Sequence, residues 1–308
     1  MSYELRQGET LGDNLRRICR KQIEDAIAIA NGKKKTEDTP VHEMRKHLKK
    51  ARAAVQIVRK EIGRGLFRQQ DHFLRDVSRL TSEIRDAEVR LQTVQQLQGI
   101  ARRRGRGHYA RLEGMLSLEL ENFMAAFAEW QTQAVSVLER AHGMVDCWPL
   151  DQFSCKQLRC SVQGAYKSAR RALRNAETNP TVKSFHQLRI KAKMLWYQLR
   201  ILRPINPVVL KNLSDDLHSL NDLLGRAHDL SFLGERLRGE GQKSEWQREG
   251  HKLLAVIEVS QADLQRGAAE LAQHFFAERA RDFGARVGGW LKEWKKESSP
   301  SIAEELVT

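Results

Sequence analysis

The residues best suited to chemistry in this 308-residue chain are two sets of histidine, arginine and lysine spaced three and four positions apart. Residues 41–59 align with residues 185–203 without a gap. The matched cationic positions are His42 with His186, Arg45 with Arg189, Lys49 with Lys193, and Arg59 with Arg203. Because such spacing places side chains on one face of an α-helix, the sequence predicts two helices that each present a cationic face.

The mixture of cationic side chains favours phosphate as the ligand. Arginine presents a planar fork of donors, lysine a mobile ammonium group, and histidine a donor that is available even when the imidazole is neutral. His42 and His186 are expected in the first turns of their helices, where free backbone N–H groups attract anions. The cations extend over about three turns, roughly 15 Å at 1.5 Å per residue, which favours an extended polyanion over a small one.

The cationic faces border the apolar faces of the same helices, roughly 80 to 160° away at 100° per residue. Five arginines in the preceding segments occupy the same sector of their own helices: Arg16, Arg20, Arg159, Arg170 and Arg174. A second repeat aligns residues 80–89 with 223–232 and matches Asp86 with Asp229, which we expect to be structural partners of the cations. Alternatively, these aspartates or a backbone carbonyl bind the two motif histidines. Two similar bundles that pack about a pseudo-twofold axis would enclose a basic cleft.

Apolar residues recur every three or four positions almost throughout the chain, and only six prolines occur, which is typical of an all-α protein. The expected helices cover residues 11–31, 40–62, 66–98, 108–145, 154–177, 184–203, 208–237, 244–259 and 262–295. We expect Thr39 to cap the second of these helices, and Ser184 with Gln187 to form a capping box for the sixth. The glycine-broken, arginine-rich run at 102–107 is expected to be a loop.

The composition indicates a negatively charged partner, because the formal net charge is +14. The sequence has no apolar run of about eighteen residues and no apolar signal segment, so we expect a cytoplasmic protein without a membrane span. The four cysteines lack CxxC spacing. We therefore expect them to be small buried apolar residues rather than disulfides or zinc ligands.

These repeated motifs resemble the CHAD family, the conserved histidine α-helical domain, in which a helix beginning H-x-x-R occurs twice. The segments that carry the resemblance are HEMRKHLKKAR (42–52), HQLRIKAKMLWY (186–197), SEIRDAEV (82–89) and LLGRAHDL (223–230). The resemblance implies two antiparallel helical bundles of long helices, related by an internal pseudo-twofold repeat. The expected bundles are residues 1–150 and 151–297 of a single domain, followed by a frayed tail at 298–308.

The resemblance also implies a basic central channel that binds inorganic polyphosphate, and association with polyphosphate granules. Carried over position by position, the implied ligands are His42, Arg45, Lys49, Lys50, Arg52, His186, Arg189 and Lys193. Met194 and Trp196 stand where the family often has basic residues. Lys191 and Arg200 are therefore added as candidate ligands on the second helix.

Two other functions are compatible with the same residues. RNA or DNA binding is favoured by the charge, although no helix-turn-helix, RNP or zinc-finger pattern occurs. Catalysis would use His42 or His186 as a phosphoryl acceptor, or a metal held with Asp86 or Asp229 to hydrolyse phosphoanhydrides. The sequence contains no GxxxxGK loop. We therefore expect binding without catalysis, cofactor or metal, while the oligomeric state stays open.

Overall fold

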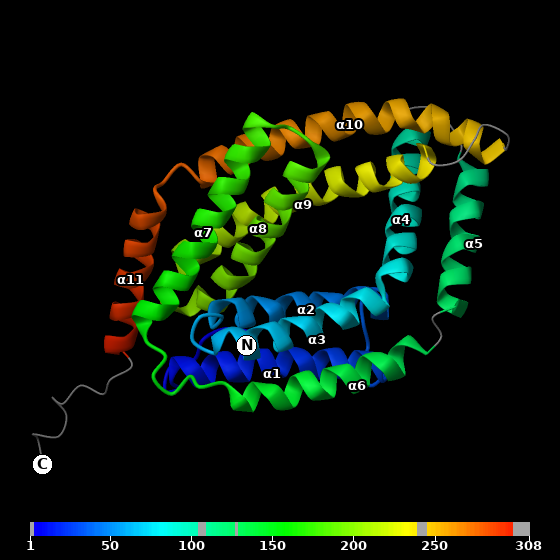
Figure 1. Cartoon of the computed structure of the whole chain (residues 1–308). Coiled ribbons are helices and arrows are strands. Elements are labelled where there is room, and N and C mark those ends of the chain that lie inside the picture. Colours follow the sequence, from blue (N-terminus) through cyan, green and yellow to red (C-terminus); the bar gives the residue numbers. More distant parts are fainter. Residues whose placement is uncertain (1–2, 104–108, 127–128, 239–244, 298–308) are drawn as a thin grey trace, which may run out of the picture.

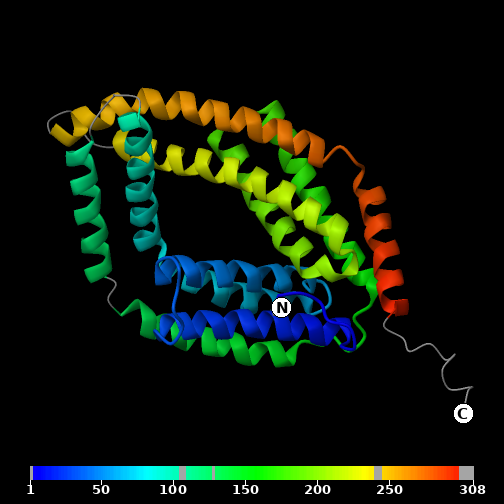
Figure 2. The same cartoon turned by 180° about the vertical axis from the view of Figure 1, so that it is seen from behind.

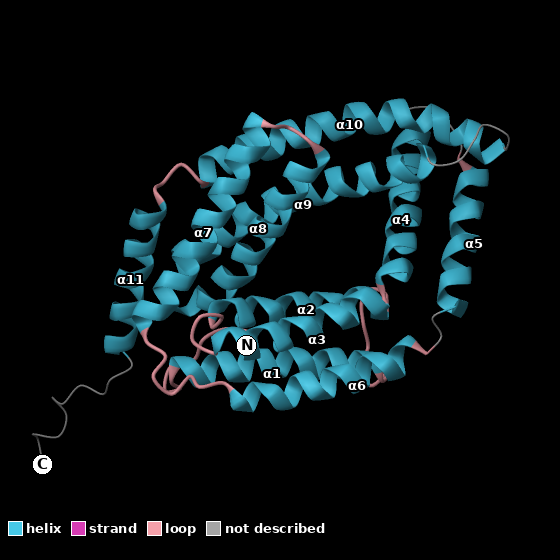
Figure 3. Cartoon of the chain, viewed as in Figure 1, coloured by secondary structure: helices cyan, strands magenta, loops and turns pink. Residues whose placement is uncertain are grey.

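The structure is a computed structural model that describes residues 3–103, 109–126, 129–238 and 245–297, and the regular elements in these ranges are all helical (Figure 3). The α-helices are α1 (Leu11–Ala30), α2 (Pro40–Ile57), α3 (Gly63–Leu80), α4 (Ser82–Arg103), α5 (Ala110–Ala126), α6 (Trp130–Gly143), α7 (Cys155–Thr178), α8 (Val182–Leu202), α9 (Pro207–Arg238), α10 (Glu245–Phe275) and α11 (Ala280–Glu297). Two 3-10 helices, η1 (Met144–Cys147) and η2 (Arg203–Ile205), follow α6 and α8. The expected all-α class is confirmed.

The helices form two groups that meet where α2 packs against α8. Helices α1, α2, α3 and α6 lie side by side in the lower half of Figure 1, and Figure 2 shows the same group from behind. Helices α7, α8, α9 and α10 pack in succession, with α11 against α7. Helices α4 and α5 extend from the first group to α9 and α10 (Figure 1). The two motif helices are therefore in direct contact.

Residues 66–98 form two helices rather than the single helix expected. Helix α3 ends at Leu80, because Thr81 leaves the helical conformation with φ −110° and ψ 15°. Val77 of α3 packs in one apolar cluster and Val94 of α4 packs in another. Both helices bury an apolar face, so the apolar periodicity continues through the bend without marking it.

Several other expected boundaries are also wrong. Residues 108–145 contain two helices, α5 and α6. The break expected at residues 260–261 lies inside α10, because the serine and glutamine at these positions are tolerated in a helix. The chain instead turns at residues 276–279, between α10 and α11. Arg102 and Arg103 end α4 rather than beginning a loop. The rest of that arginine-rich run and the expected frayed tail lie outside the described residues.

Threonine side chains cap the first turn of both motif helices. Thr39 accepts a hydrogen bond from the His42 N–H at 3.3 Å, which confirms the expected cap of α2. Helix α8 begins earlier than expected, because Thr181 is its N-cap and Ser184, three residues later, completes the capping box. His186 therefore lies in the second turn of α8, and its expected place in the first turn is wrong.

Two clusters of buried apolar side chains hold the helices together. The main cluster draws on both groups of helices and so joins residues on either side of position 150. The smaller cluster joins α4, α5, α9 and α10 through residues such as Val94, Leu112, Leu233 and Ile257. This second cluster fixes the position of α4, which carries part of the site described below.

The cysteines are all free, and their burial differs from the expectation. Cys19 is buried, whereas Cys147 and Cys160 are exposed. Cys160 follows the buried Leu158 by two residues, which turns its side chain to the opposite side of α7. Among the described helices, none has both the length and the apolar character that a bilayer crossing requires.

We expect alanine at Gly12 to lower the free energy of unfolding by about 2 kcal/mol, the cost of overpacking. A Cβ atom at Gly12 would overlap the Leu150 carbonyl oxygen and lie 2.9 Å from the Leu150 Cβ atom, so α1 would have to move. The matched control is Gly164→Ala in α7, where a Cβ atom meets nothing within 4 Å. That control should raise stability by up to about 1 kcal/mol, the usual helical preference for alanine. Urea denaturation measures both, and equal effects of the two changes would contradict this packing.

Candidate polyanion-binding site

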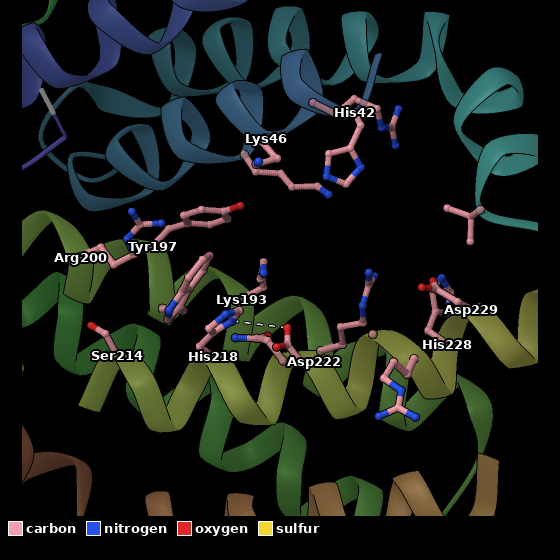
Figure 4. A pocket seen from close by; sticks show the side chains of 18 of the residues that line it. His42, Lys46, Lys193, Tyr197, Arg200, Ser214, His218, Asp222, His228 and Asp229 are labelled. Atoms are coloured by element: carbon pink, nitrogen blue, oxygen red, sulfur yellow. Dashed lines mark ion pairs between the residues drawn. The ribbon is translucent and has the colours of Figure 1, made fainter. Parts of the chain in front are cut away.

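A pocket of about 1100 Å³ lies between α2, α4, α8 and α9, and we call it the α2–α8 pocket (Figure 4). Ten lysines and arginines line it: Arg45, Lys46, Lys49, Arg85, Arg189, Lys193, Arg200, Arg203, Lys211 and Arg226. The four carboxylates in the lining are Asp86, Asp215, Asp222 and Asp229. The pocket therefore carries a marked excess of positive charge, which attracts anions.

Helical periodicity explains how α2 and α8 present their cations at this pocket. Met44 and Leu48 are fully buried on the apolar side of α2, as are Leu188 and Ala192 on α8. The cationic positions flank these apolar stripes, and α2 packs directly on α8. The cationic flanks of both motif helices therefore border one pocket. Figure 4 shows His42 and Lys46 extending from α2 toward the pocket, with Lys193 and Arg200 of α8 across from them.

Lys49, Arg189 and Lys193 form a cluster of like charges in the pocket, because repulsion from Arg189 acts on both lysines. Within the described ranges, these three cations make no ion pair within 4 Å. Lys49 reaches solvent through the pocket, but protein surrounds most of its side chain. This burial, and then repulsion from Arg189, lower the pKa of Lys49 to about 7. Burial and then repulsion from Arg189 lower the pKa of Lys193 to about 8. A bound anion would reverse both effects, because it favours the charged amines.

The two arginines of the motifs are mostly surrounded by protein. Arg45 donates hydrogen bonds to the Ser78 carbonyl oxygen and, at 3.4 Å, to the Thr81 hydroxyl, both of which are neutral acceptors. Burial lowers the pKa of both arginines. The negative charge of Asp86 opposes this effect at Arg45, and that of Asp229 opposes it at Arg189. These aspartates act on the arginines at a distance, without an ion pair within 4 Å in the described part of the chain.

The two motif histidines occupy different surroundings. His42 lines the pocket, and its Nε2 atom lies 3.6 Å from the Asp38 carboxylate. Burial of the imidazole, and then repulsion from the positive charge of Arg85, lower the pKa of His42 to about 4. His186 lies behind the pocket wall, where its Nδ1 atom is 3.3 Å from Nδ1 of His228, which does line the pocket. The suggested pairing of these histidines with Asp86 and Asp229 is wrong. Neutral imidazole at His42 donates one hydrogen bond to an anion without adding charge.

One cluster at the edge of the pocket has the composition of a metal site. Asp38, His42 and Glu43 each place a possible ligand atom within 4.8 Å of the others. Glu43 is already paired with Lys46 at 2.7 Å, and the positive charge of Arg85 acts on His42. Both neighbours disfavour a cation here, since a metal ion would have to displace one and approach the other.

Aromatic side chains line one end of the pocket, and the sequence did not identify them as site residues. The Lys193 Nζ atom lies 4.1 Å from the Trp196 ring centroid, and the Arg200 guanidinium carbon lies 4.9 Å from it. His218 of α9 stacks on the same indole with ring centroids 5.5 Å apart. Trp196 thus orients two of the cations at the site through cation–π contacts.

Eight of the predicted ligands do not line the pocket, and His186, described above, is one of them. Three of the others form ion pairs: Arg16 with Asp13 and Asp151, Arg20 with Asp146, and Arg52 with Asp71. Arg170 donates a hydrogen bond to the Phe276 carbonyl oxygen, and Lys50 lies over the Tyr3 ring. Arg174 is exposed on α7, and Lys191 lines a separate cavity. An angular position on one helix does not determine which helices pack against it. Six of the predicted residues line the pocket: His42, Arg45, Lys49, Arg189, Lys193 and Arg200.

Further cations in the pocket were missed by reasoning from the motifs. Lys46 lies on α2, Arg85 on α4, and Lys211 and Arg226 on α9. Arg85 belongs to the second repeated block, which was a usable signal. The side chains of α9 could not be identified in this way, because α9 is charged on several faces.

Comparison with known proteins identifies the family. A search of curated protein sequences found no match. The crystal structure of the CHAD domain from the plant Ricinus communis resembles the whole chain, with a TM-score of 0.59, 16% sequence identity, and coverage of 94% of this chain and 95% of that one. The family model of the CHAD domain matches residues 17–238, which include both histidine motifs and the helices that line the pocket. The chain therefore belongs to the CHAD domain family.

Proposed function

We propose that this protein binds inorganic polyphosphate in the α2–α8 pocket and does so without catalysis. The observation that carries the proposal is the crowding of Lys49, Arg189 and Lys193 without ion pairs among the described residues. Such a cluster raises the energy of the empty protein, and a polyanion relieves the repulsion. In this proposal the two chain halves are copies of one helical unit, and each copy supplies one cationic wall of a basic channel.

A linear phosphate chain matches the charge and the extent of the pocket. Polyphosphate carries one negative charge on each internal unit, and every lysine or arginine that it contacts releases counterions, which favours binding at low salt. Arg45 and Lys49 lie along α2 while Arg189 and Lys193 lie along α8, so a chain passing between the helices would touch both. Targeting to polyphosphate granules is the cellular role that we propose for this binding.

Nucleic acid is the second candidate ligand, because Trp196 and His218 add aromatic surfaces to a cationic pocket. Bases stack on such side chains in single-strand binding proteins. Two observations favour polyphosphate. Trp196 already contacts Lys193 and the His218 ring, and most of the lining consists of charged rather than aromatic side chains.

Removing the crowded cations should remove polyphosphate binding. We expect Lys49→Gln, Arg189→Gln and Lys193→Gln each to raise the Kd about tenfold, which corresponds to about 1.4 kcal/mol. The triple variant should lose at least about a hundredfold, together with part of the salt dependence. Fluorescence anisotropy with labelled polyphosphate measures the affinity. Long-chain polyphosphate should also displace RNA at equal phosphate concentration, and phosphate release during incubation with a divalent metal would contradict binding without catalysis.

The matched control for this series is Lys191→Gln. Lys191 lies on α8 only two residues before Lys193, but its side chain is exposed and lines the cavity on the other side of the helix. This variant should change the Kd less than about twofold, as is usual for a distant surface charge. A folded triple variant with the affinity of the wild type would exclude the α2–α8 pocket as the site.

Affinity for polyphosphate should fall as pH rises from about 6 to about 9. Anion binding favours the charged lysines, whose pKa values in the free protein are about 7 for Lys49 and about 8 for Lys193. Below these values both amines are already protonated, and above them each must take up a proton on binding. Each group then weakens the affinity by up to about tenfold per pH unit.

Calorimetry in two buffers with different ionisation enthalpies measures this proton uptake. At pH near 8 the wild type should take up protons when polyphosphate binds. The Lys49→Arg, Lys193→Arg double variant should take up almost none, because guanidinium groups stay charged. Equal proton uptake by the two proteins would contradict the assignment of the pH dependence to these lysines.

A further inference from the structure

We infer that Lys49 is a site of covalent acylation, with acyl phosphates, the mixed anhydrides of a carboxylic acid and phosphoric acid, as the acyl donors. The inference rests on the proposed function in one respect. The cations that would bind polyphosphate would also hold the phosphate of the donor. Acylation would then control whether the pocket binds its polyanion.

The first step in the argument is the chemical state of Lys49. Its side chain reaches solvent inside the pocket, so a small reagent has access to the amine. The charged groups that act on Lys49 from the surrounding helices include Arg45 of α2, Arg85 of α4, Arg189 and Lys193 of α8, and the carboxylate of Asp229 of α9. The charge of Lys49 also acts on the imidazole of His42. Because the four cations outweigh the Asp229 carboxylate and burial acts in the same direction, the pKa of Lys49 falls to about 7. A large share of the amine is therefore unprotonated and nucleophilic at neutral pH.

The second step is the choice of donor. The phosphate of an acyl phosphate is the same kind of anion as the end of a polyphosphate chain, so Arg189 and Lys193 can bind it. The acyl carbon is one bond away from the bridging oxygen of that phosphate. An anion held beside Lys49 therefore presents a reactive carbonyl to the amine, which raises the effective concentration of the donor. The pocket, at about 1100 Å³, has room for such a small molecule.

The reaction is a simple acyl transfer. The lone pair of the Lys49 Nζ atom attacks the acyl carbon, the bond between this carbon and the bridging oxygen breaks, and phosphate leaves with the electron pair. The nitrogen releases one proton to water and becomes a neutral amide. Arg189 and Lys193 would stabilise the negative charge on the departing phosphate. The product has one positive charge fewer in this cluster of like charges.

Lys46 provides an internal comparison for Lys49. It lies on the same helix, lines the same pocket, and differs in being paired with Glu43 at 2.7 Å. The Lys46 amine is therefore held against a carboxylate, whereas Lys49 makes no ion pair within 4 Å in the described part of the chain. Both lysines meet the same reagent in the same pocket, so the comparison isolates the surroundings of the amine.

The test is a time course of acetylation of the whole chain by acetyl phosphate near pH 7.5, with the occupancy of each lysine followed by peptide mass spectrometry. We expect Lys49 to be acetylated at least about tenfold faster than Lys46, because the Lys49 amine has a lowered pKa and no carboxylate bound to it. Inorganic phosphate and polyphosphate should each slow the reaction at Lys49. Equal rates at Lys49 and Lys46 would overturn the inference.

Two further arms separate guidance by phosphate from general reactivity of the amine. Inorganic phosphate should slow the acetylation of Lys49 by an uncharged N-hydroxysuccinimide ester less than the acetylation by acetyl phosphate, because bound phosphate favours the protonated amine in both reactions but competes only with acetyl phosphate for Arg189 and Lys193. Arg189→Gln, checked for folding by circular dichroism, should lower the rate with acetyl phosphate more than the rate with the ester. If inorganic phosphate leaves the acetyl phosphate reaction unchanged, the donor is not held through its phosphate, and the assignment of acyl phosphates is wrong.

Polyphosphate binding measured on the same preparations distinguishes failure of this inference from failure of the proposed function. Tight polyphosphate binding together with an unreactive Lys49 overturns only the acylation. Rapid acetylation that inorganic phosphate slows, in a protein that does not bind polyphosphate, overturns only the proposed function. Where both hold, acetylated protein should bind polyphosphate about tenfold more weakly, the loss expected for Lys49→Gln.

Discussion

Repulsion among the cations at the contact between α2 and α8 is the constraint on which the rest of the structure depends. Lys49, Arg189 and Lys193 are held in a partly enclosed space, where burial lowers the pKa of each, and repulsion from Arg189 adds to this effect at both lysines. Apolar packing must offset this cost, and the fully buried Leu48 and Ala192 beneath the cations contribute to it. Stability and ligand binding therefore oppose each other at these positions, which is common where a site is built for a charged ligand.

The opposite walls of the pocket depend on contacts far from the motif helices. Glu119 of α5 accepts hydrogen bonds from Arg90 of α4 and, at 3.3 Å, from Arg236 of α9. The apolar cluster of Val94 and Leu233 lies between the same helices. These contacts tie α4 to α9, which itself packs along α8, and the space that remains between these three helices and α2 is the pocket. A site of this kind needs the whole set of helices, because neither motif helix alone encloses an anion.

Helical periodicity correctly placed cations of α2 and α8, such as Lys49 and Arg189, at one pocket, because it determines which side chains share a face. It also included Lys50, Arg52 and His186, which do not line the pocket. It could not predict which other helices lie opposite. Arg16 and Arg170 occupy the expected sector of their own helices, but α1 and α7 pack elsewhere, and these arginines bind Asp151 and a backbone carbonyl instead. Arg85 enters the pocket because the chain bends at Thr81, and the apolar pattern continues through that bend unchanged. The direction of a helix after a bend is set by tertiary packing, which local sequence does not encode.

The crystal structure of the protein with a short polyphosphate chain is the most direct measurement of whether α2 and α8 bind one ligand together. We expect a single chain of phosphates to run through the α2–α8 pocket, with oxygens at hydrogen-bonding distance, about 3 Å, from both Lys49 and Arg189. Phosphates bound only on outer surfaces, such as the exposed face of α7 around Arg174, would contradict a shared site.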